Sequence, residues 1–385
     1  IFKNFKSSFI KLSKFSLLFI CLLVYDCLSA MIIKTIFSLA ASIIKFIIIY
    51  LFFLNAYADP VNKKYEPKEK GILALMYHRF DENKYPSTNI KINDFKTHLR
   101  IIEENNIKFI NPKDFENELQ NNKLQRKILL TIDDGFLSFY ENAWPILKAK
   151  KIPFILFVST REIGAFNYMT WSQIREISKE DFVEIGNHSH THEYLVEEKN
   201  ELIRSDIETS MSIFKKELGK NSDFFSYPFG EYSNEFKKII KSLNFKYAFG
   251  QHSGVMDETK DFYEFPRFPI NEKYGEIKRF KSLMKTLPFK FKNVLPEEKY
   301  LLQNQNPPNV KIEFYDGIKN LKSLNCFSNE AAKWRQSEIN FLNDTTLEIN
   351  INEKFVGERG RINCSLKEKH GFWRWLGIQY VVSEK

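Results

Sequence analysis

The sequence predicts an α/β fold, an incomplete (β/α) barrel, followed by a small antiparallel β domain. Between Gly71 and about Gly250, short apolar runs alternate with amphipathic helical segments, the pattern of a parallel sheet with helices between its strands. After about Pro308, short runs in which apolar and polar residues alternate replace this pattern. The parallel sheet is either open or closed into a barrel. We favour a barrel, and an incomplete one because eight clear strand–helix units are not visible.

The first 58 residues have the features of an export leader. They contain two hydrophobic runs, residues 15–25 and 36–54, and six lysines against one acidic residue, Asp26. Six positive charges less one leave +5 of the chain's net charge of +9 in this leader. The net positive charge of the chain is therefore largely a property of the leader, and it does not argue for nucleic-acid binding.

Small residues before Asp59 predict a cleavage site. Met31 begins a segment with a basic start and a long apolar run, and Ala56 and Ala58 offer the small side chains that signal peptidase accepts. We expect translation to start at Met31 and cleavage to follow Ala58, which places the mature protein in the periplasm or outside the cell. The alternative is an uncleaved membrane anchor, because the apolar run is long enough to span a bilayer.

The barrel, residues 59–273, is predicted from its apolar runs. Several are continuously hydrophobic, as strands buried on both faces are. The predicted strands are residues 72–77, 108–110, 128–132, 154–158, 183–185, 224–227 and 246–249. The predicted helices between them are residues 94–104, 112–119, 138–150, 171–177, 201–218 and 234–243. Asn111-Pro112 and Ser233 are favourable helix starts.

A Lys-rich segment, residues 274–307, is predicted to link the barrel to an accessory β domain of residues 308–385. The predicted strands of this domain are residues 310–314, 346–351, 361–365 and 377–382. Cys326 and Cys364 are the cysteines left in the mature chain. An even pair in an oxidising compartment predicts a disulfide.

Polar side chains gather where the predicted strands end. Tyr77-His78 follows the first strand and Asp133-Asp134-Gly135 follows the third, while residues 186–192 follow the fifth and residues 227–230 follow the sixth. In parallel barrels the carboxyl ends of the strands converge on one face, where active sites are built. Four such junctions predict an active site on this face.

Asp133, Asp134, His188 and His192 are the candidates for a metal centre. Asp-Gly pairs are common in turns, but two adjacent carboxylates at the end of a buried strand are unfavourable unless a cation or a function holds them there. His188 and His192 can direct both imidazoles to one point, and two histidines with one carboxylate form a ligand set of catalytic zinc. A His-rich surface loop is the alternative, and we expect His190 to belong to that class.

Three of these motifs resemble those of a known family. Residues 131–135 (TIDDG), 188–192 (HSHTH) and 227–230 (YPFG) are similar, in order and spacing, to the first three motifs of the polysaccharide deacetylases of carbohydrate esterase family 4. The resemblance covers about residues 70–270. It implies a distorted (β/α) barrel, one divalent metal ion, usually zinc, and removal of acetyl groups from N-acetylglucosamine in chitin-like, peptidoglycan or biofilm polymers.

The resemblance also implies roles for individual residues. Asp134, His188 and His192 would hold the metal, and Asp133 would be the general base. The backbone N–H of Phe229 would stabilise the oxyanion. Tyr227 and Phe229 also lie near the strand ends, where aromatic faces suit sugar rings, and core packing is the alternative for both.

The chain departs from the family pattern at two places. Ser226 stands where the third motif usually has an arginine, and Arg267 is the candidate to replace it as the partner that orients Asp133. The late Leu-x-x-His motif, which normally supplies the general acid, is not found after residue 250.

These two departures, together with residues 76–78 (MYH), resemble the sequence features of the subgroup that deacetylates poly-N-acetylglucosamine in bacterial adhesins. That resemblance implies His78 as the general acid, and His252 is the competitor.

The predicted function is that of an exported, metal-dependent polysaccharide N-deacetylase acting on a polymer that contains N-acetylglucosamine. Contact with a membrane is expected only through the leader, if the leader is not cleaved. Two other functions stay open: a catalytically inactive carbohydrate-binding protein on the same barrel, and a metal-dependent amidase for another acyl amide. The intact Asp133-Asp134 pair argues against the binding protein, because a lectin needs no desolvated acid pair.

Overall fold

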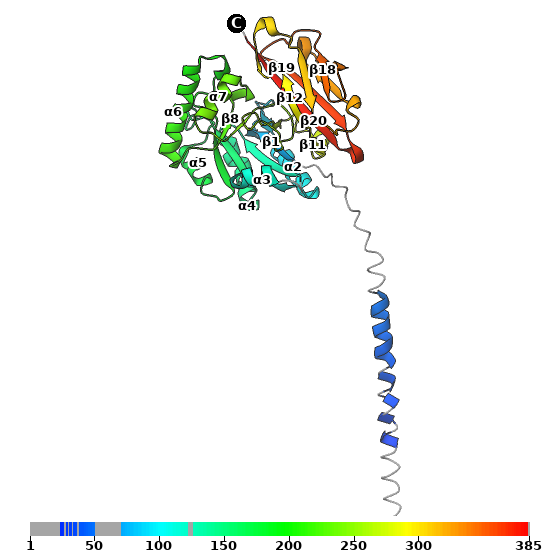
Figure 1. The fold of residues 1–385 in the computed structure, drawn as a ribbon. Coiled ribbons are helices and arrows are strands. Elements are labelled where there is room, and N and C mark those ends of the chain that lie inside the picture. Colours follow the sequence, from blue (N-terminus) through cyan, green and yellow to red (C-terminus); the bar gives the residue numbers. More distant parts are fainter. Residues whose placement is uncertain are drawn as a thin grey trace, which may run out of the picture. The chain divides into compact units, whose positions relative to one another are not determined.

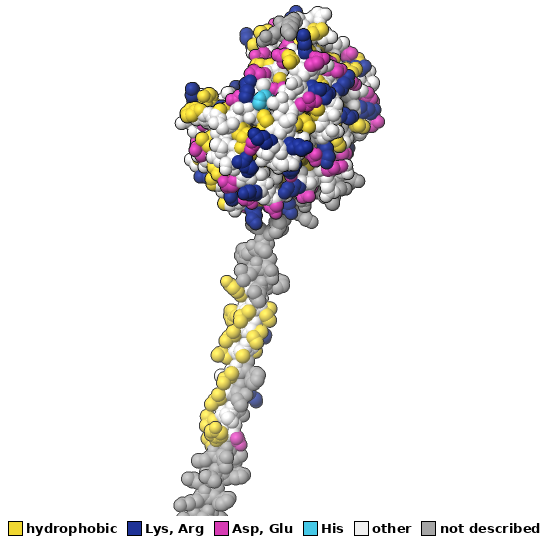
Figure 2. Space-filling view, turned by 90° about the vertical axis from the view of Figure 1, so that its left-hand side faces the viewer, with side chains coloured by type: hydrophobic (Ala, Val, Ile, Leu, Met, Phe, Trp, Pro, Cys, Tyr) yellow, Lys and Arg dark blue, Asp and Glu magenta, His cyan; other side chains and the backbone are white. Residues whose placement is uncertain are grey.

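The computed structural model describes residues 24–26, 28–29, 31–32, 34–36, 38–50, 71–121 and 126–383 (Figure 1). The chain divides into two compact units, residues 1–66 and residues 67–385. In the first unit, residues 38–50 form a helix whose side chains are exposed and mostly hydrophobic (Figure 2). Among the helices of the described residues, none is both long enough and apolar enough to cross a membrane. The predicted cleavage site after Ala58 lies outside the described residues.

A parallel sheet is the framework of the second unit. Its strands are hydrogen-bonded in the order β10-β1-β5-β6-β7-β8-β9, with β4 also beside β5. They are β1 (Ile72–Tyr77), β4 (Lys108–Phe109), β5 (Lys127–Ile132), β6 (Phe154–Val158), β7 (Val183–Asn187), β8 (Phe224–Ser226), β9 (Tyr247–Phe249) and β10 (Phe268–Pro269). A single parallel bridge from Phe249 to Phe265, together with the pairing of β10 with β1, brings residues 265–269 between the two ends of the sheet. The predicted incomplete, distorted barrel is confirmed.

Helices cover the sheet between successive strands. They are α2 (Ile92–Glu104), α3 (Phe115–Asn121), α4 (Trp144–Lys150), α5 (Trp171–Ile177), α6 (Asn200–Leu218), α7 (Asn234–Ser242) and α8 (Ile277–Leu283). The predicted helix at 138–150 is divided into a π-helical turn, Phe139–Ala143, and α4. The division falls where Pro145, which has no N–H to donate, must occupy the first turn of a new helix.

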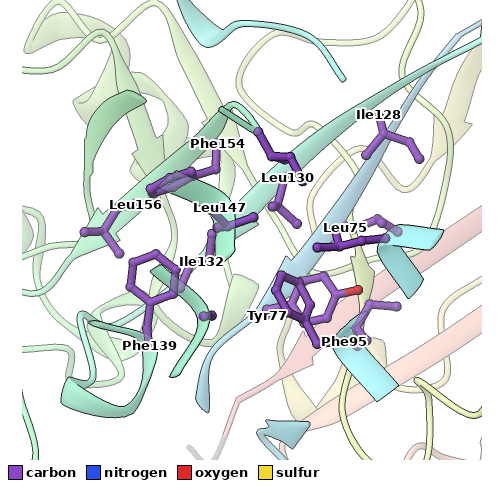
Figure 3. Close-up of a cluster of buried hydrophobic side chains, with 14 of the residues drawn as sticks. Leu75, Tyr77, Phe95, Ile128, Leu130, Ile132, Phe139, Leu147, Phe154 and Leu156 are labelled. Carbon is purple, nitrogen blue, oxygen red and sulfur yellow. The ribbon is translucent and has the colours of Figure 1, made fainter. Parts of the chain in front are cut away.

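The main hydrophobic core packs strands β1, β5 and β6 against α2 and α4 (Figure 3). The ring of Tyr77 meets that of Phe95 edge to face, with centroids 5.3 Å apart, and both side chains are buried. Burial of each such side chain contributes about 1.5–3 kcal/mol. This packing holds β1 and β5 in register, with Tyr77 opposite Ile132. The next residues, His78 and Asp133, therefore leave the sheet side by side.

The C-terminal residues form two further sheets around a second core. One sheet has the order β11-β20-β19-β15-β16 with β13 beside β20, and the other has the order β12-β14-β18-β17. The strands are β11 (Thr286–Pro288), β12 (Phe291–Leu295), β13 (Tyr300–Leu301), β14 (Val310–Phe314), β15 (Asn325–Ser328), β16 (Arg335–Gln336), β17 (Glu338–Phe341), β18 (Thr346–Asn350), β19 (Arg359–Lys367) and β20 (Trp373–Val382). In the structure the segment 274–307 thus contains α8, β11, β12 and β13, and these three strands pair with β20 and β14.

The β domain packs directly against the barrel. The backbone N–H of Gly377 in β20 donates to the carbonyl of Ser253, at 2.6 Å. A Cβ at Gly377 would lie 2.5 Å from that carbonyl oxygen, so the close approach requires glycine. The ring of Trp375 also meets that of Phe268 in β10, with centroids 6.1 Å apart. β20 is therefore held at the edge of the barrel.

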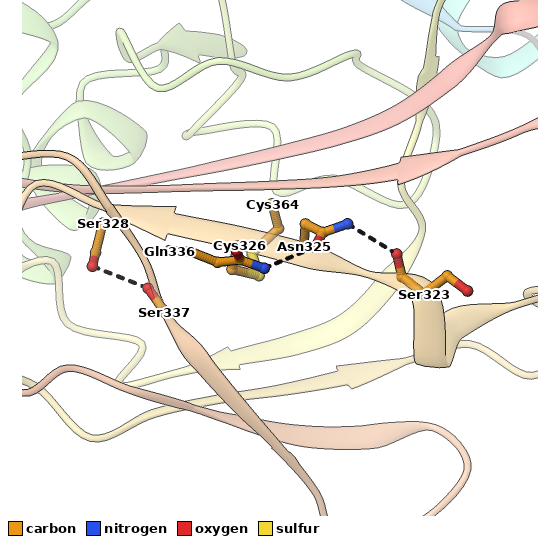
Figure 4. Close-up of a disulfide and its surroundings, with 7 residues drawn as sticks. All are labelled: Ser323, Asn325, Cys326, Ser328, Gln336, Ser337 and Cys364. Carbon is orange, nitrogen blue, oxygen red and sulfur yellow. Dashed lines mark hydrogen bonds between the residues drawn. A yellow bond between two sulfur atoms is a disulfide. The ribbon is translucent and has the colours of Figure 1, made fainter.

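The predicted disulfide between Cys326 and Cys364 is confirmed (Figure 4). The two cysteines lie opposite each other on the antiparallel strands β15 and β19. Both are fully buried in the core of the β domain. The bond closes a loop with a sequence separation of 38 residues.

Replacing both cysteines with alanine is expected to lower the free energy of unfolding by about 2–4 kcal/mol, because the unfolded chain regains the entropy of the open loop. Chemical denaturation without reductant measures the change. Adding reductant should destabilise the natural protein and leave the double variant unaffected. An unchanged unfolding midpoint in the variant would contradict the prediction.

Candidate active site

The structure brings the three predicted metal ligands together. Asp134 follows β5, His188 follows β7, and His192 lies four residues further on. The Nε2 atom of His188 is 3.3 Å from Oδ1 of Asp134, and the Nε2 atom of His192 is 3.4 Å from the same oxygen. One ligand atom from each residue fits within a span of 4.8 Å. A single ion could contact all three.

The chemistry of these atoms fits a divalent cation. Oδ1 of Asp134 and Nε2 of His188 are buried and have no hydrogen-bond partner among the described residues. Nδ1 of His188 lies 2.7 Å from the carbonyl oxygen of Ser226, so Nδ1 carries the proton and Nε2 offers its lone pair. A backbone acceptor on the second nitrogen is typical of metal-ligating histidines. The backbone of Asp134 and of His192 is left-handed, a strained conformation that is common at functional sites.

The ligand Asp134 remains a carboxylate in this environment. Burial raises its pKa, but the neighbouring histidines His188, His192 and His78 outweigh burial and hold the pKa well below its usual range. An ionised carboxylate between two imidazoles is a ligand set for catalytic zinc.

Asp133 lies directly beside this cluster and is paired with Arg267. Oδ1 of Asp133 accepts from a guanidinium nitrogen of Arg267 at 2.7 Å, and both side chains are fully buried. Oδ2 of Asp133 is 3.9 Å from Nε2 of His188. Burial raises the pKa of Asp133, but Arg267, His188 and His78 together outweigh burial, so the pKa lies below its usual value. Arg267 therefore keeps Asp133 ionised and fixes its orientation.

Ser226 connects the two parts of the site, a role that was not predicted from the sequence. Its hydroxyl accepts from Arg267 at 2.8 Å and donates to Asp133 at 3.4 Å, while its carbonyl accepts from His188. A lone serine at the end of a strand has no distinguishing pattern. The only signal was its position, where the family usually has an arginine.

Asp206 on α6 is a second supporting residue that the sequence did not reveal. Its carboxylate accepts from the backbone N–H groups of His190 and Thr191, at 2.7 and 3.0 Å. These bonds hold the loop that carries His188 and His192. The His190 ring is outside the cluster, because its Nδ1 lies 2.8 Å from the hydroxyl of Thr160.

Phe229 and Tyr227 have different surroundings. Phe229 is in the left-handed region, with φ 56°, and its ring meets that of His192 edge to face, with centroids 4.7 Å apart. Phe229 lines the cavity above the metal cluster. Tyr227 is fully buried, and its hydroxyl donates to the carbonyl of Tyr263. The Tyr227 ring packs in the core beneath the loop and does not line the cavity.

The cavity above the cluster has a volume of about 630 Å³. Asp134 and His192 line its floor, and His78 and His252 are both on its wall. Burial and the nearby positive charges of Lys299 and other basic residues lower the pKa of His252 to about 3. His252 is therefore neutral at neutral pH and carries no proton to donate as an imidazolium.

The β domain supplies the opposite wall of the same cavity. The residues that line this wall are Trp334, Arg359, Arg361, Asn363, Trp375 and Gln379. None of them belongs to the barrel motifs on which the predicted site rests. They lie more than 140 residues after the metal ligands, and only the packing of β19 and β20 against the barrel brings them to the site.

Comparisons with known proteins point to the same chemistry. A family profile described as polysaccharide deacetylase matches residues 120–248, the stretch that contains Asp133, Asp134, His188 and His192. Residues 120–248 are therefore a polysaccharide deacetylase domain. The family and the class of enzyme predicted from the three motifs, a polysaccharide deacetylase, are thereby confirmed.

Two relatives of this polysaccharide deacetylase are named poly-β-1,6-N-acetyl-D-glucosamine N-deacetylase. The protein from Staphylococcus aureus is 27% identical over 256 residues, which cover 59% of this chain and 88% of the relative. The protein from Staphylococcus epidermidis is 26% identical over 246 residues, which cover 57% of this chain and 85% of the relative.

Solved structures share the barrel of this polysaccharide deacetylase. IcaB from Ammonifex degensii aligns with a TM-score of 0.52 and 24% identity, over 56% of this chain and 98% of that one. The deacetylase PplD from Streptococcus pyogenes, solved with acetate, aligns with a TM-score of 0.51 and 22% identity, over 56% of this chain and 99% of that one. At this level of identity the likeness shows the fold.

Proposed function

We propose that this polysaccharide deacetylase hydrolyses the N-acetyl group of N-acetylglucosamine units in poly-N-acetylglucosamine, releasing acetate and a free amine. The observation that carries the proposal is the juxtaposition of Asp134, His188 and His192, within 4.8 Å, with the buried carboxylate of Asp133. The names of the two staphylococcal relatives support this choice of polymer. The donor set supports one divalent cation, zinc, as the cofactor.

Asp133 is the general base in this proposal. Arg267 keeps its carboxylate ionised and oriented, and the carboxylate lies close enough to the metal ligands to take a proton from an attacking water. A divalent cation held by Asp134, His188 and His192 supplies Lewis-acid chemistry, because it makes water more acidic and polarises a carbonyl group. The backbone N–H of Phe229 is the proposed donor to the oxyanion of the tetrahedral intermediate.

His78 is the proposed general acid. It follows β1 beside Asp133 and lines the cavity with Asp134 and His192. The departing sugar nitrogen must receive a proton as the C–N bond breaks, and an imidazolium at the His78 position in the cavity can deliver it. The competitor His252 lines the same cavity, but burial holds its pKa at about 3.

The proposed location is outside the cytoplasm, in the periplasm or secreted, with membrane anchoring if the leader is retained. The support is the sequence of residues 31–59, with its long apolar run and the Ala-Tyr-Ala stretch. A polysaccharide substrate outside the cell is consistent with this location, and a biofilm polymer is the proposed example.

Acetate release from a panel of N-acetylglucosamine polymers, with and without chelator, tests the proposal. We expect release from the β-1,6-linked polymer, loss of release with chelator, and recovery when zinc is added back. Release that chelator does not affect would remove the metal from the mechanism. Polymer binding without any release would favour the carbohydrate-binding protein, and release only from other acyl amides would favour the amidase.

His78→Ala is expected to retain metal and to lose turnover on the order of 10²–10⁴-fold, the usual loss when a general acid is removed. Metal analysis and acetate release measure the two effects. His252→Ala is the matched comparison, because its imidazole lines the same cavity, and we expect a smaller loss. Near-normal turnover in His78→Ala with a large loss in His252→Ala would transfer the role to His252.

A further inference from the structure

The cavity above the metal cluster is strongly cationic, and the proposed reaction does not account for this. Three arginines line it: Arg279, Arg359 and Arg361. The only carboxylate in the described lining is Asp134, which the metal would occupy. A neutral N-acetylglucosamine chain needs no such charge, and the deacetylated product carries an ammonium group that these arginines repel.

Two of the three arginines form no ion pair within 4.0 Å among the described residues. Arg359 pairs with Glu231 through Nε. Arg361 donates instead from Nε to the side-chain oxygen of Gln379, at 3.0 Å, and Arg279 donates to the backbone carbonyl of Tyr274. Within residues 71–121 and 126–383, no Asp or Glu oxygen lies within 4.0 Å of a side-chain nitrogen of Arg279 or Arg361.

Arg279 and Arg361 are contributed by different parts of the fold and line the same cavity. Arg279 lies on α8, and Arg361 lies on β19 of the β domain. The guanidinium of Arg279 is 5.0 Å from the centroid of the Tyr274 ring, and Tyr274 and Arg361 line the same cavity. Both arginines are half-buried, and burial lowers the pKa of each guanidinium. Partial burial of a charge is costly unless a partner of opposite charge compensates for the lost hydration.

The same cavity is lined by aromatic side chains that can pack against a sugar ring. Trp334 is 51% exposed and Tyr274 is 37% exposed, and both line the cavity. An exposed tryptophan in a concave site offers a flat apolar face for the face of a sugar ring. A polysaccharide unit lying on Tyr274 would place its ring hydroxyls next to Arg279, whose guanidinium is 5.0 Å from the Tyr274 ring centroid.

We propose that Arg279 and Arg361 form a subsite for an anionic substituent of the polysaccharide, a carboxylate or phosphate half-ester on a unit close to the one being deacetylated. A guanidinium fork binds either group through paired, charge-assisted hydrogen bonds. The inference rests on the proposed function, since it takes the polymer to lie across the metal cluster. It also gives the β domain a role in choosing which stretches of polymer are deacetylated.

Oligosaccharides of N-acetylglucosamine with matched length, one neutral and one carboxymethylated on ring hydroxyls, test the subsite. With the zinc-loaded full chain, we expect kcat/KM to favour the carboxymethylated oligosaccharide about tenfold, mainly through KM, because two charge-assisted forks bind its carboxylate. The preference should shrink as sodium chloride is raised. No preference in the natural protein would overturn the proposal.

Variants then assign the preference to the two arginines. Arg279→Gln and Arg361→Gln should each reduce the ratio of the two kcat/KM values, and the double variant should abolish it. Arg361→Lys, which keeps the charge but loses the fork, should retain part of it. Arg100→Gln is the matched control, because Arg100 is 67% exposed on α2. An undiminished ratio in the double variant would overturn the proposal.

Calorimetric titration of chelator-treated protein separates this subsite from the proposed function. The carboxymethylated oligosaccharide should bind metal-free protein more tightly than the neutral one, and the double variant should lose the difference. If no oligosaccharide releases acetate, the proposed function fails, and these titrations alone decide the subsite. Acetate, titrated in parallel, should bind at least tenfold more weakly. Equal affinity would assign the arginines to the released acetate and overturn the proposal.

Discussion

Asp133→Asn is expected to lower turnover on the order of 10²–10⁴-fold while metal content stays unchanged. An amide has nearly the shape of the carboxylate and can still lie against Arg267, but it cannot accept the proton of an attacking water. Metal content should not change, because Oδ2 of Asp133 is 3.9 Å from Nε2 of His188, outside hydrogen-bond distance. Acetate release and metal analysis of the purified variant measure the two effects.

Asp134→Asn is the control for this prediction, because it changes the neighbouring carboxylate in the same way. Here we expect loss of metal, since an amide oxygen is a much poorer ligand than a carboxylate for a divalent cation. If Asp133→Asn loses metal while Asp134→Asn keeps it, the roles of the two residues are reversed. The unfolding midpoint of each variant shows whether the fold has survived the loss of the pair with Arg267.

His188→Ala and His192→Ala are each expected to lose most of the bound metal and, with it, nearly all acetate release. Each substitution removes one of three protein ligands, and a site with two ligands holds a divalent ion far more weakly. His188 should show the larger effect, because its ring is almost fully buried and is fixed by the carbonyl of Ser226. Metal content by elemental analysis and turnover are the measurements.

His190→Ala is the matched control for these two variants. His190 lies between them in the sequence, but its ring is bonded to Thr160 and is outside the metal cluster. We expect it to retain metal. Full metal occupancy in the double variant of His188 and His192 would show that the ion is bound elsewhere.

Most of the barrel was predictable because its signals are local. The continuous apolar run at residues 154–158 predicts a strand with both faces buried, and β6 has these bounds. The helix at 171–177 is present with the same bounds, and Thr170 caps its first turn. β10, Phe268–Pro269, has no such signal, because two residues that include a proline show no period. Its place beside β1 follows from the tertiary packing.

Some residues of the candidate site were predictable from the sequence, and others were not. The motifs predicted which groups stand at the strand ends, because Asp133, Asp134, His188 and His192 follow strands whose carboxyl ends must converge. Arg267 was inferred as the partner of Asp133 only from the missing family arginine, and the structure brings the two side chains together. Ser226 and Asp206 were not inferred, because a single buried serine or a helical aspartate resembles any other in the sequence.

By itself, the sequence determined the parallel sheet, the chemical groups at its carboxyl edge, and the similarity of its motifs to those of the polysaccharide deacetylases. These follow from the order and spacing of residues along single segments. Only the tertiary structure decided which charges meet. Arg267 reaches Asp133 across a separation of 134 residues, and Arg361 reaches the cavity from a domain that the family motifs do not cover. Ion pairs and cavity walls depend on distances between segments, and the spacing of residues along one segment carries no record of those distances.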